Sequence, residues 1–227
     1  MASWQLLDAE RHADLRMTPA TAAGRHFVQV VPAELTRIAA RCPIFLAKHP
    51  ETGRFYTGAI FGFASGENLL LQADETLDGV MPLDLERAGF FIADENIAID
   101  REHPRFKLDE GAALFDADGK PSEHLQRVQR ALGGMKVGLD ETETFIKPLL
   151  ELKLVEPIDI ALTFDDGERL ALEELYTISR DALGGLGDNA VLTLFRSGQL
   201  QLVDVMIASL QQIPLLARRR NDRLLLG

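Results

Sequence analysis

Cysteine is scarce in this chain: Cys42 is the only one among 227 residues. A single cysteine excludes an intramolecular disulfide framework, and a chain of this size without bridges is typical of a reducing compartment. The N-terminal residues also lack the basic segment and apolar core of a secretion signal. We therefore expect a cytoplasmic protein. The alternative is a cell-surface protein that arrives by a route without an N-terminal signal.

Long apolar runs and an excess of positive charge are also lacking. No run approaches the roughly 18 to 20 residues that cross a bilayer, so we expect no membrane span. Lys and Arg number 24 against 35 Asp and Glu, and the formal net charge is -11. Because nucleic-acid binding depends on Lys and Arg that neutralise phosphates, this balance argues against nucleic acid as a partner.

Sequence-local signatures of catalysis are missing as well. The five histidines include no i, i+4 pair that would place two imidazoles beside one metal. The segment 116–119 begins like a calcium loop, but it lacks a third ligand before its glycine, and Arg127 stands where the loop needs glutamate. No Gly-x-Ser-x-Gly motif is present, and 184–187 lacks the Lys-Ser/Thr of a phosphate-binding loop. We expect no metal and no cofactor. Whether the protein is an enzyme stays open, and the absence of these signatures argues against it.

What is present is the composition of an ordinary globular protein, with 46% hydrophobic and 26% charged residues. No linker or repeat divides the chain, so we predict a single domain over 1–227. Within it, the polar segment 1–25 predicts an extended N-terminal arm that packs on the body. Residues 214–227 predict a basic C-terminal tail, whose arginines either solubilise the chain end or contact an acidic protein or lipid surface.

The first half of the chain is rich in short β-branched and aromatic segments, which predict strands. Pro32 predicts the start of a helix over 33–41. The turn-forming residues 49–53 join two of the segments into a hairpin. The expected strands are 27–31, 44–47, 55–63, 69–71, 90–92 and 97–99.

A second hairpin is expected near 158–172, where apolar residues alternate with others on both sides of 165–167. A three-residue loop with its glycine in the left-handed conformation pairs Leu162 with Leu170. That register keeps every apolar residue of the hairpin on one face.

Helical periodicity is concentrated in 121–153 and 188–213. In the first segment, Gly133 predicts a break and Pro148 a kink. Pro214 ends the second segment. Because regular alternation of strands and helices is absent, we predict an α+β fold with a mainly antiparallel sheet in the N-terminal half.

Seven stretches form an ordered set along almost the whole chain: 10–16, 31–35, 42–45, 66–69, 114–119, 154–158 and 195–200. In order and spacing they resemble the bacterial SapC-like family, which is named after a surface-layer-associated protein. The resemblance implies an accessory protein that binds a protein partner or a small ligand in an uptake, modification or cell-surface system. Family association implies cupin-like or halogenase-like enzymes, or a TonB-dependent uptake system, as partners.

Two alternatives stay open: an enzyme whose site is assembled from distant segments, and a surface-layer or envelope component. The candidate ligand- or partner-contacting residues are His12, Arg16, Arg196 and Ser197, which lie in stretches that resemble the family. Each also has a structural interpretation. His12 and Arg16, at i, i+4, would hold the N-terminal arm, and Arg196 with Ser197 would join two helices. No catalytic residue is assigned.

Overall fold

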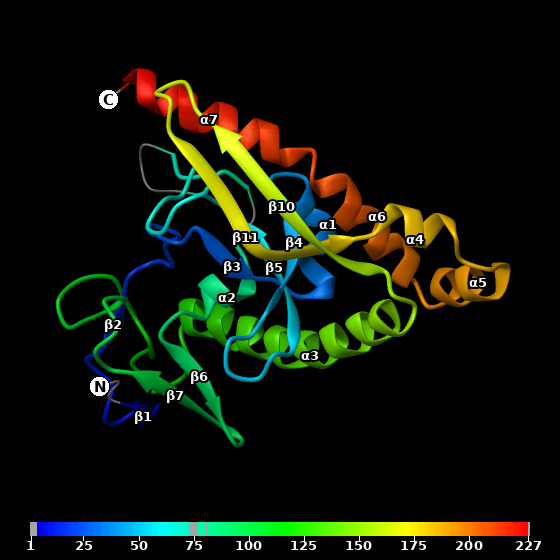
Figure 1. The fold of residues 1–227 in the computed structure, drawn as a ribbon. Coiled ribbons are helices and arrows are strands. Elements are labelled where there is room, and N and C mark those ends of the chain that lie inside the picture. Colours follow the sequence, from blue (N-terminus) through cyan, green and yellow to red (C-terminus); the bar gives the residue numbers. More distant parts are fainter. Residues whose placement is uncertain (1–3, 73–76, 80, 227) are drawn as a thin grey trace. The chain divides into compact units, whose positions relative to one another are not determined.

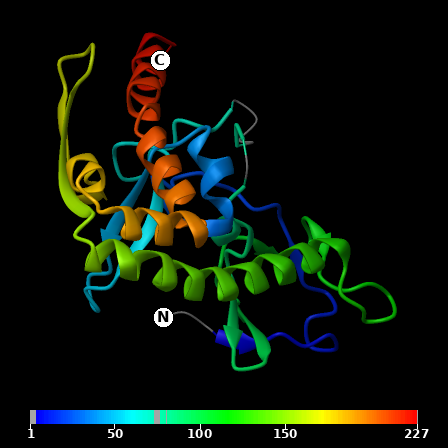
Figure 2. The same cartoon turned by 90° about the vertical axis from the view of Figure 1, so that its right-hand side faces the viewer.

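A computed structural model describes residues 4–72, 77–79 and 81–226, and Figures 1 and 2 show its fold. The chain is α+β, as predicted, and the strand pairs among these residues are antiparallel. It divides into two compact units, which we call the small unit (Met1–Thr21 with Leu83–Val137) and the large unit (Ala22–Pro82 with Gly138–Gly227). Each is described by itself, and the expectation of a single domain stays a prediction.

The small unit is built on two three-stranded sheets. The strands expected at 90–92 and 97–99 are confirmed. Besides the strands, the unit contains α2 and the first part of α3. The elements are β1 (Trp4–Leu6), β7 (Asn96–Asp100) and β6 (Phe90–Ala93) in one sheet, β8 (Phe106–Lys107), β2 (Arg16–Met17) and β9 (Ala112–Ala113) in the other, α2 (Leu83–Glu86) and α3 (Glu123–Glu151).

The small unit has its own hydrophobic core, to which the predicted N-terminal arm contributes. Leu15 and Met17 of the arm are buried in it, and the arm also supplies β1 and β2. The arm is therefore part of the fold of this unit through Thr21. The buried residues of the core are Leu15, Met17, Phe90, Ile99, Phe106, Leu114, Leu125, Val128 and Leu132.

The large unit contains a five-stranded antiparallel sheet, and α6 packs against α1 and against two of its strands. The helix expected at 33–41 and the hairpin around 49–53 are confirmed. In sheet order the strands are β10 (Val155–Thr163), β11 (Arg169–Ile178), β4 (Ile44–Lys48), β5 (Phe55–Ile60) and β3 (Phe27–Gln29), and the helices are α1 (Pro32–Ala39), α4 (Arg180–Gly184), α5 (Asp188–Arg196), α6 (Gln199–Ser209) and α7 (Gln212–Leu226).

The hairpin of β10 and β11 has the register that its sequence predicts. Leu162 pairs with Leu170, and Gly167 has a φ of 85°, in the left-handed region. Its apolar residues share one face because side chains alternate along a strand. The strand pattern and the Asp-Gly turn are both local features, so the sequence was sufficient to predict the register of this hairpin.

The long helix α3 corrects one expectation. It runs unbroken through Gly133 and the glycine that follows, where the sequence predicted a break. Two later contacts show what its glycines allow. A Cβ on Gly134 would lie 2.9 Å from Leu83 Cδ1, and one on Gly138 would lie 2.6 Å from the Val31 Cβ. Glycine is a poor helix former, but here it permits close packing that a larger side chain would prevent.

The turn at 69–71 corrects another expectation, because these residues do not form the predicted strand. The Asn68 side chain accepts the Leu70 backbone N–H at 2.9 Å and donates to the Ala22 carbonyl at 2.8 Å. An Asn side chain that bonds its own backbone two residues on turns the chain. A run of consecutive leucines is typical of a buried strand, but here the leucines are buried in a turn, and the sequence pattern is the same in both cases.

Pro214 does not end the last helix, so that expectation is wrong. Helix α7 begins at Gln212 and includes Pro214 in its first turn. The first N–H groups of a helix have no intrahelical partner, so a proline there loses no backbone bond. The predicted basic tail is therefore helical.

The arginines of α7 bind groups of the large unit itself. Arg219 donates to Asp78 at 2.8 Å. Arg220 donates to Glu168 at 2.7 Å and lies 4.2 Å from the centroid of the Phe164 ring, at the tip of the β10–β11 hairpin. These contacts join α7 to two other segments of the unit.

One helical stretch of the described residues, Gln199–Leu225, is long and apolar enough to cross a membrane by length and composition, and 22% of the window that qualifies is buried. This is a weak indication, because a core helix of a soluble protein passes the same test. The expected absence of a membrane span and the expected cytoplasmic location both stay predictions.

Candidate functional site

The centre of the candidate site lies on one face of the five-stranded sheet. Tyr56 pairs directly with Ala47, and Ala47 pairs with Leu175, so these three side chains share that face. Phe27 lies on the same face because it pairs with Ile60, four residues along β5 from Tyr56. Three segments far apart in the sequence thus contribute to one surface.

Gly58 opens this surface to the Phe27 ring. It lies between Tyr56 and Ile60 on the same face of β5, and a Cβ there would overlap the ring. Glycine in a strand often marks the close approach of another group. The rings of Phe27 and Tyr56 meet edge to face with their centroids 6.1 Å apart. Together they form an aromatic wall.

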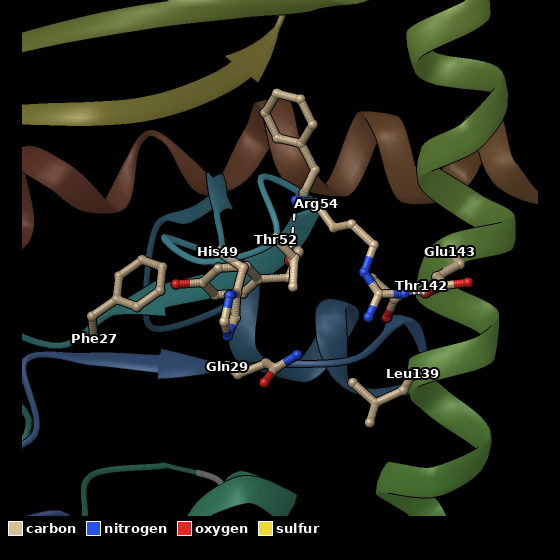
Figure 3. A pocket seen from close by; sticks show the side chains of 10 residues that line it. Phe27, Gln29, His49, Thr52, Arg54, Leu139, Thr142 and Glu143 are labelled. Carbon is tan, nitrogen blue, oxygen red and sulfur yellow. Dashed lines mark hydrogen bonds and ion pairs between the residues drawn. The ribbon is translucent and has the colours of Figure 1, made fainter.

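Two hollows meet at this wall, and both are lined by Phe27, His49 and Tyr56. The first hollow has a volume of 450 Å³ and lies between the sheet and the second part of α3 (Figure 3). The second hollow has a volume of 770 Å³ and borders β11. The other lining residues are Gln29, Thr52, Arg54, Phe55, Leu139, Thr142 and Glu143 in the first, and His26, Ala47, Lys48, Pro50, Gly53, Glu173, Glu174, Leu175 and Tyr176 in the second.

The first hollow combines apolar surface with polar groups. Arg54 pairs with Glu143 of α3, as Figure 3 shows. Both side chains are exposed, and such surface pairs contribute at most about 1 kcal/mol. The pair can therefore open at little cost to admit a ligand.

His49 belongs to both hollows and has one ring nitrogen engaged. Its Nδ1 accepts the backbone N–H of Glu51 at 3.3 Å. A neutral imidazole that accepts at Nδ1 carries its proton on Nε2. The Nε2–H group is thus the one that can donate to a ligand.

Lys48, which lines the second hollow, lies against two aromatic rings on the face of the sheet opposite Tyr56. Lys48 Nζ lies 4.8 Å from the centroid of the Tyr176 ring and 5.0 Å from that of Phe55. The two rings pack edge to face with centroids 4.9 Å apart. Distances below about 6 Å are those of cation–π attraction.

A β-bulge lies at the border of the second hollow. Glu173 and Glu174 of β11 both stand opposite the single Asp159 of β10. Glu174 has a φ of 60°, a conformation that costs a non-glycine residue on the order of 1 kcal/mol or more. Leu172 and Leu175 share a face through their partners Ile160 and Ile158, so Glu173 points to the opposite face, and both glutamates border the second hollow.

Burial changes the acidity of two side chains of the large unit. It raises the pKa of the Tyr56 phenol, which therefore stays protonated near neutral pH and can donate a hydrogen bond. It raises the pKa of the Cys42 thiol to about 12, so Cys42 is a core residue and not a ready nucleophile. Among the residues that the structure describes, no group of three His, Cys, Asp or Glu side chains could hold a metal ion.

Two of the candidate residues, His12 and Arg16, lie in the small unit. His12 is buried, and its Nδ1 accepts the backbone N–H of Asp8 at 3.0 Å. Arg16 is exposed and donates to the Gly111 carbonyl at 3.0 Å. Each side chain thus bonds the backbone of its own unit, and a functional role for either residue stays a prediction.

The other two candidates, Arg196 and Ser197, lie at the end of α5 in the large unit. Arg196 is exposed, and the Ser197 hydroxyl donates to the Leu194 carbonyl at 3.0 Å. Gly198 follows with a φ of 74°, which ends the helix where the sequence predicted. Neither candidate lines the two hollows. Their functional role also stays a prediction.

The residues of the hollows were not singled out from the sequence, although one signal was present. The apolar alternation of β11 slips by one residue between Leu172 and Leu175. Such a slip indicates a bulge, and bulges are frequent beside functional sites. Nothing in the sequence indicates that Phe27 and Tyr56 meet this bulge, because only the strand order brings them together.

Comparison with known proteins adds one finding. The family model of SapC matches residues 7–216. No curated protein and no solved structure matches the chain. Since the match covers most of its length, the chain belongs to the SapC family.

Proposed function

We propose that this chain is an accessory protein that binds a small organic ligand in the two hollows around Tyr56. The observation that carries the proposal is the wall of Phe27 and Tyr56, which the two hollows share. Ligand sites are typically hollows of about 300 to 1,000 Å³, lined by aromatic and apolar side chains with a few polar groups that orient the ligand. Both volumes fall within that range.

The polar groups around the wall are suited to orienting a ligand. Tyr56 and His49 line both hollows, and each side chain carries a group that can donate a hydrogen bond. Gly58 supports the same interpretation. Glycine is a poor strand former, but at this position it leaves room for the Phe27 ring to lie against the backbone of β5. A ligand with an aromatic or alicyclic body and polar ends fits this arrangement.

Ligand-observed NMR with a library of small aromatic and alicyclic molecules tests the proposal. Molecules that bind the wild type should lose at least tenfold in affinity in Phe27→Ala and in Tyr56→Ala, because each change removes half of the wall. Phe195→Ala is the matched control, since it truncates an exposed aromatic ring outside both hollows. Equal binding by all four proteins, or no binding by any, would contradict the proposal.

A second candidate function is the docking of a protein partner on α5. Phe195 is 67% exposed and Leu192 is 46% exposed, three positions apart on one side of the helix. Arg196 follows them and is also exposed. Aromatic residues and arginine are enriched in the centres of protein interfaces.

Quantitative cross-linking in the native organism distinguishes the two functions. A partner that uses α5 should be recovered with the wild type and with Phe27→Ala, but not with the double variant Phe195→Ser, Arg196→Glu. Recovery that is the same for all three proteins excludes docking on this surface.

A further inference from the structure

The first hollow has its charges paired and several neutral groups unpaired. Arg54 and Glu143 form the ion pair that joins the loop after β4 to α3. The Gln29 side chain makes no hydrogen bond to the residues that the structure describes, and neither does the Tyr56 hydroxyl. A neutral His49 ring, bonded at Nδ1, keeps its Nε2–H. The groups left for a ligand are therefore neutral.

Strand register places Gln29 beside the aromatic wall. It pairs with Gly58, on the face of the sheet that carries Phe27 and Tyr56. Its Cβ is a diagonal neighbour of the Tyr56 Cβ, at a separation of roughly 7 Å in an antiparallel pair. In the view of Figure 3, the Gln29 side chain lies between Phe27 and Leu139. An amide, which has both donors and an acceptor, thus stands next to the rings.

The second part of α3 forms the opposite side of the hollow. A Cβ on Gly138 would lie 2.6 Å from the Val31 Cβ, so the helix approaches the chain two residues beyond Gln29. Leu139 and Glu143, one helical turn apart, line the hollow from this helix. Leu139 is 43% exposed, which leaves apolar surface open to a ligand. A ligand here would meet an apolar side chain on the helix as well as rings on the sheet.

These groups fit a ligand that is neutral, apolar on its faces and polar around its rim. An apolar ligand would bury the Gln29 amide and the Tyr56 hydroxyl without hydrogen-bond partners, which is costly. A ligand with a charge of either sign would displace Arg54 or Glu143 from their pair and leave the other partner alone. A sugar avoids both costs. Its hydroxyls both donate and accept, and its polarised C–H groups are attracted to the negative faces of aromatic rings.

We infer that the ligand of the first hollow is a neutral sugar, with its ring against the aromatic wall and its hydroxyls bonded to Gln29 and His49. This inference rests on the proposed function and names the chemical class of its ligand. The ion pair serves the same ligand without opening, because the Glu143 carboxylate accepts from a hydroxyl and the Arg54 guanidinium donates to one. The volume of 450 Å³ lies in the lower half of the range for ligand sites, which suits a ligand of one or two rings.

NMR titration with probes of similar size tests the inference. The neutral probes are the methyl glycosides of glucose, galactose and mannose. The matched probes are the methyl glycosides of glucuronic acid and glucosamine, which are charged, and cyclohexylmethanol, which has a single hydroxyl. At least one neutral glycoside should bind the wild type at least tenfold more tightly than every matched probe. Failure of all three glycosides to bind, or equal binding of a matched probe, would overturn the inference.

Two variants locate the sugar. Gln29→Leu removes the amide at similar volume, and Tyr56→Phe removes only the hydroxyl and keeps the ring. The first should weaken the best glycoside at least tenfold and the second several-fold, whereas cyclohexylmethanol should bind both variants as well as it binds the wild type. Gln201→Leu is the control, because it changes an exposed glutamine outside both hollows. Tyr56→Phe keeps the test decisive if Gln29→Leu does not fold. A glycoside that binds all these proteins alike contradicts the inference.

The outcomes separate this inference from the proposed function. If the library screen finds a ligand whose binding Tyr56→Ala abolishes, but no glycoside binds, the hollow is a ligand site and not a sugar site. If neither the glycosides nor the library molecules bind, the proposed function fails with the inference.

Discussion

In the small unit, the buried cation Arg105 bonds its surroundings through its whole guanidinium. Its Nε donates to the Thr18 carbonyl at 2.9 Å, its Nη1 donates to the Glu86 carbonyl at 2.6 Å, and its Nη2 lies 3.8 Å from the Glu86 carboxylate. In the large unit, Glu173 and Glu174 line a hollow with no such partners among the described residues. The first arrangement holds chain segments together, and the second leaves interactions available to another molecule.

The contrast shows how a structural polar residue differs from a binding one. A buried polar group must be bonded, because desolvation without a partner costs on the order of 1 to 3 kcal/mol or more. His12 follows this rule in the small unit, as its ring bonds the chain on which it lies. Groups that keep bonding capacity in a hollow, together with local strain, are better candidates for function.

The largest effect is expected from Arg105→Ala in the small unit. The change leaves two carbonyls and a carboxylate without their cation, so we expect a loss of about 3 to 5 kcal/mol in the free energy of unfolding. Urea denaturation followed by circular dichroism measures it. The control is Arg11→Ala, at an exposed position, with an expected change within about 0.5 kcal/mol. A loss below about 1 kcal/mol for Arg105→Ala would break the comparison.

An effect of opposite sign is expected from Glu174→Gly in the large unit. Glycine adopts a φ of 60° without strain, so we expect the free energy of unfolding to rise by about 1 kcal/mol. Urea denaturation followed by circular dichroism measures the change. A variant that is less stable would show that Glu174 serves the fold, as Arg105 does.

The smallest effect concerns an ion pair of the large unit and its pH dependence. The hydrogen bond from Arg219 holds the pKa of Asp78 below its usual range. The stabilisation is therefore fully present above the ordinary carboxyl pKa of about 3.9 and is lost as pH falls through the lowered folded value. Asp78→Asn should cost about 0.5 to 1 kcal/mol at pH 7.

Urea denaturation of wild type and Asp78→Asn at pH 7 and in acid measures this contribution. The difference between the two proteins should shrink in acid, below the lowered pKa of Asp78. A constant difference would show that the loss at pH 7 comes from packing and not from charge. A difference at pH 7 as large as that of Arg105→Ala would remove the contrast between a partly exposed pair and a buried one.

Local patterns predicted much of the fold and little of the site. The register of Leu162 with Leu170 followed from alternation and an Asp-Gly turn, and the end of α5 followed from Gly198. The break at Gly133 failed because neighbouring segments decide whether a glycine interrupts a helix. The four candidate residues came from stretches that resemble the family, and none of them lines the hollows.

The sequence by itself determined the α+β class, the family, the β10–β11 hairpin and the start of α1, since each depends on residues close together in the chain. Only the tertiary structure decided that Phe27 and Tyr56 share one face of a sheet with Leu175, which follows the bulge of β11. The order β10-β11-β4-β5-β3 brings them together across more than a hundred residues of chain. Strand order is set by long-range packing and pairing, which no local pattern encodes.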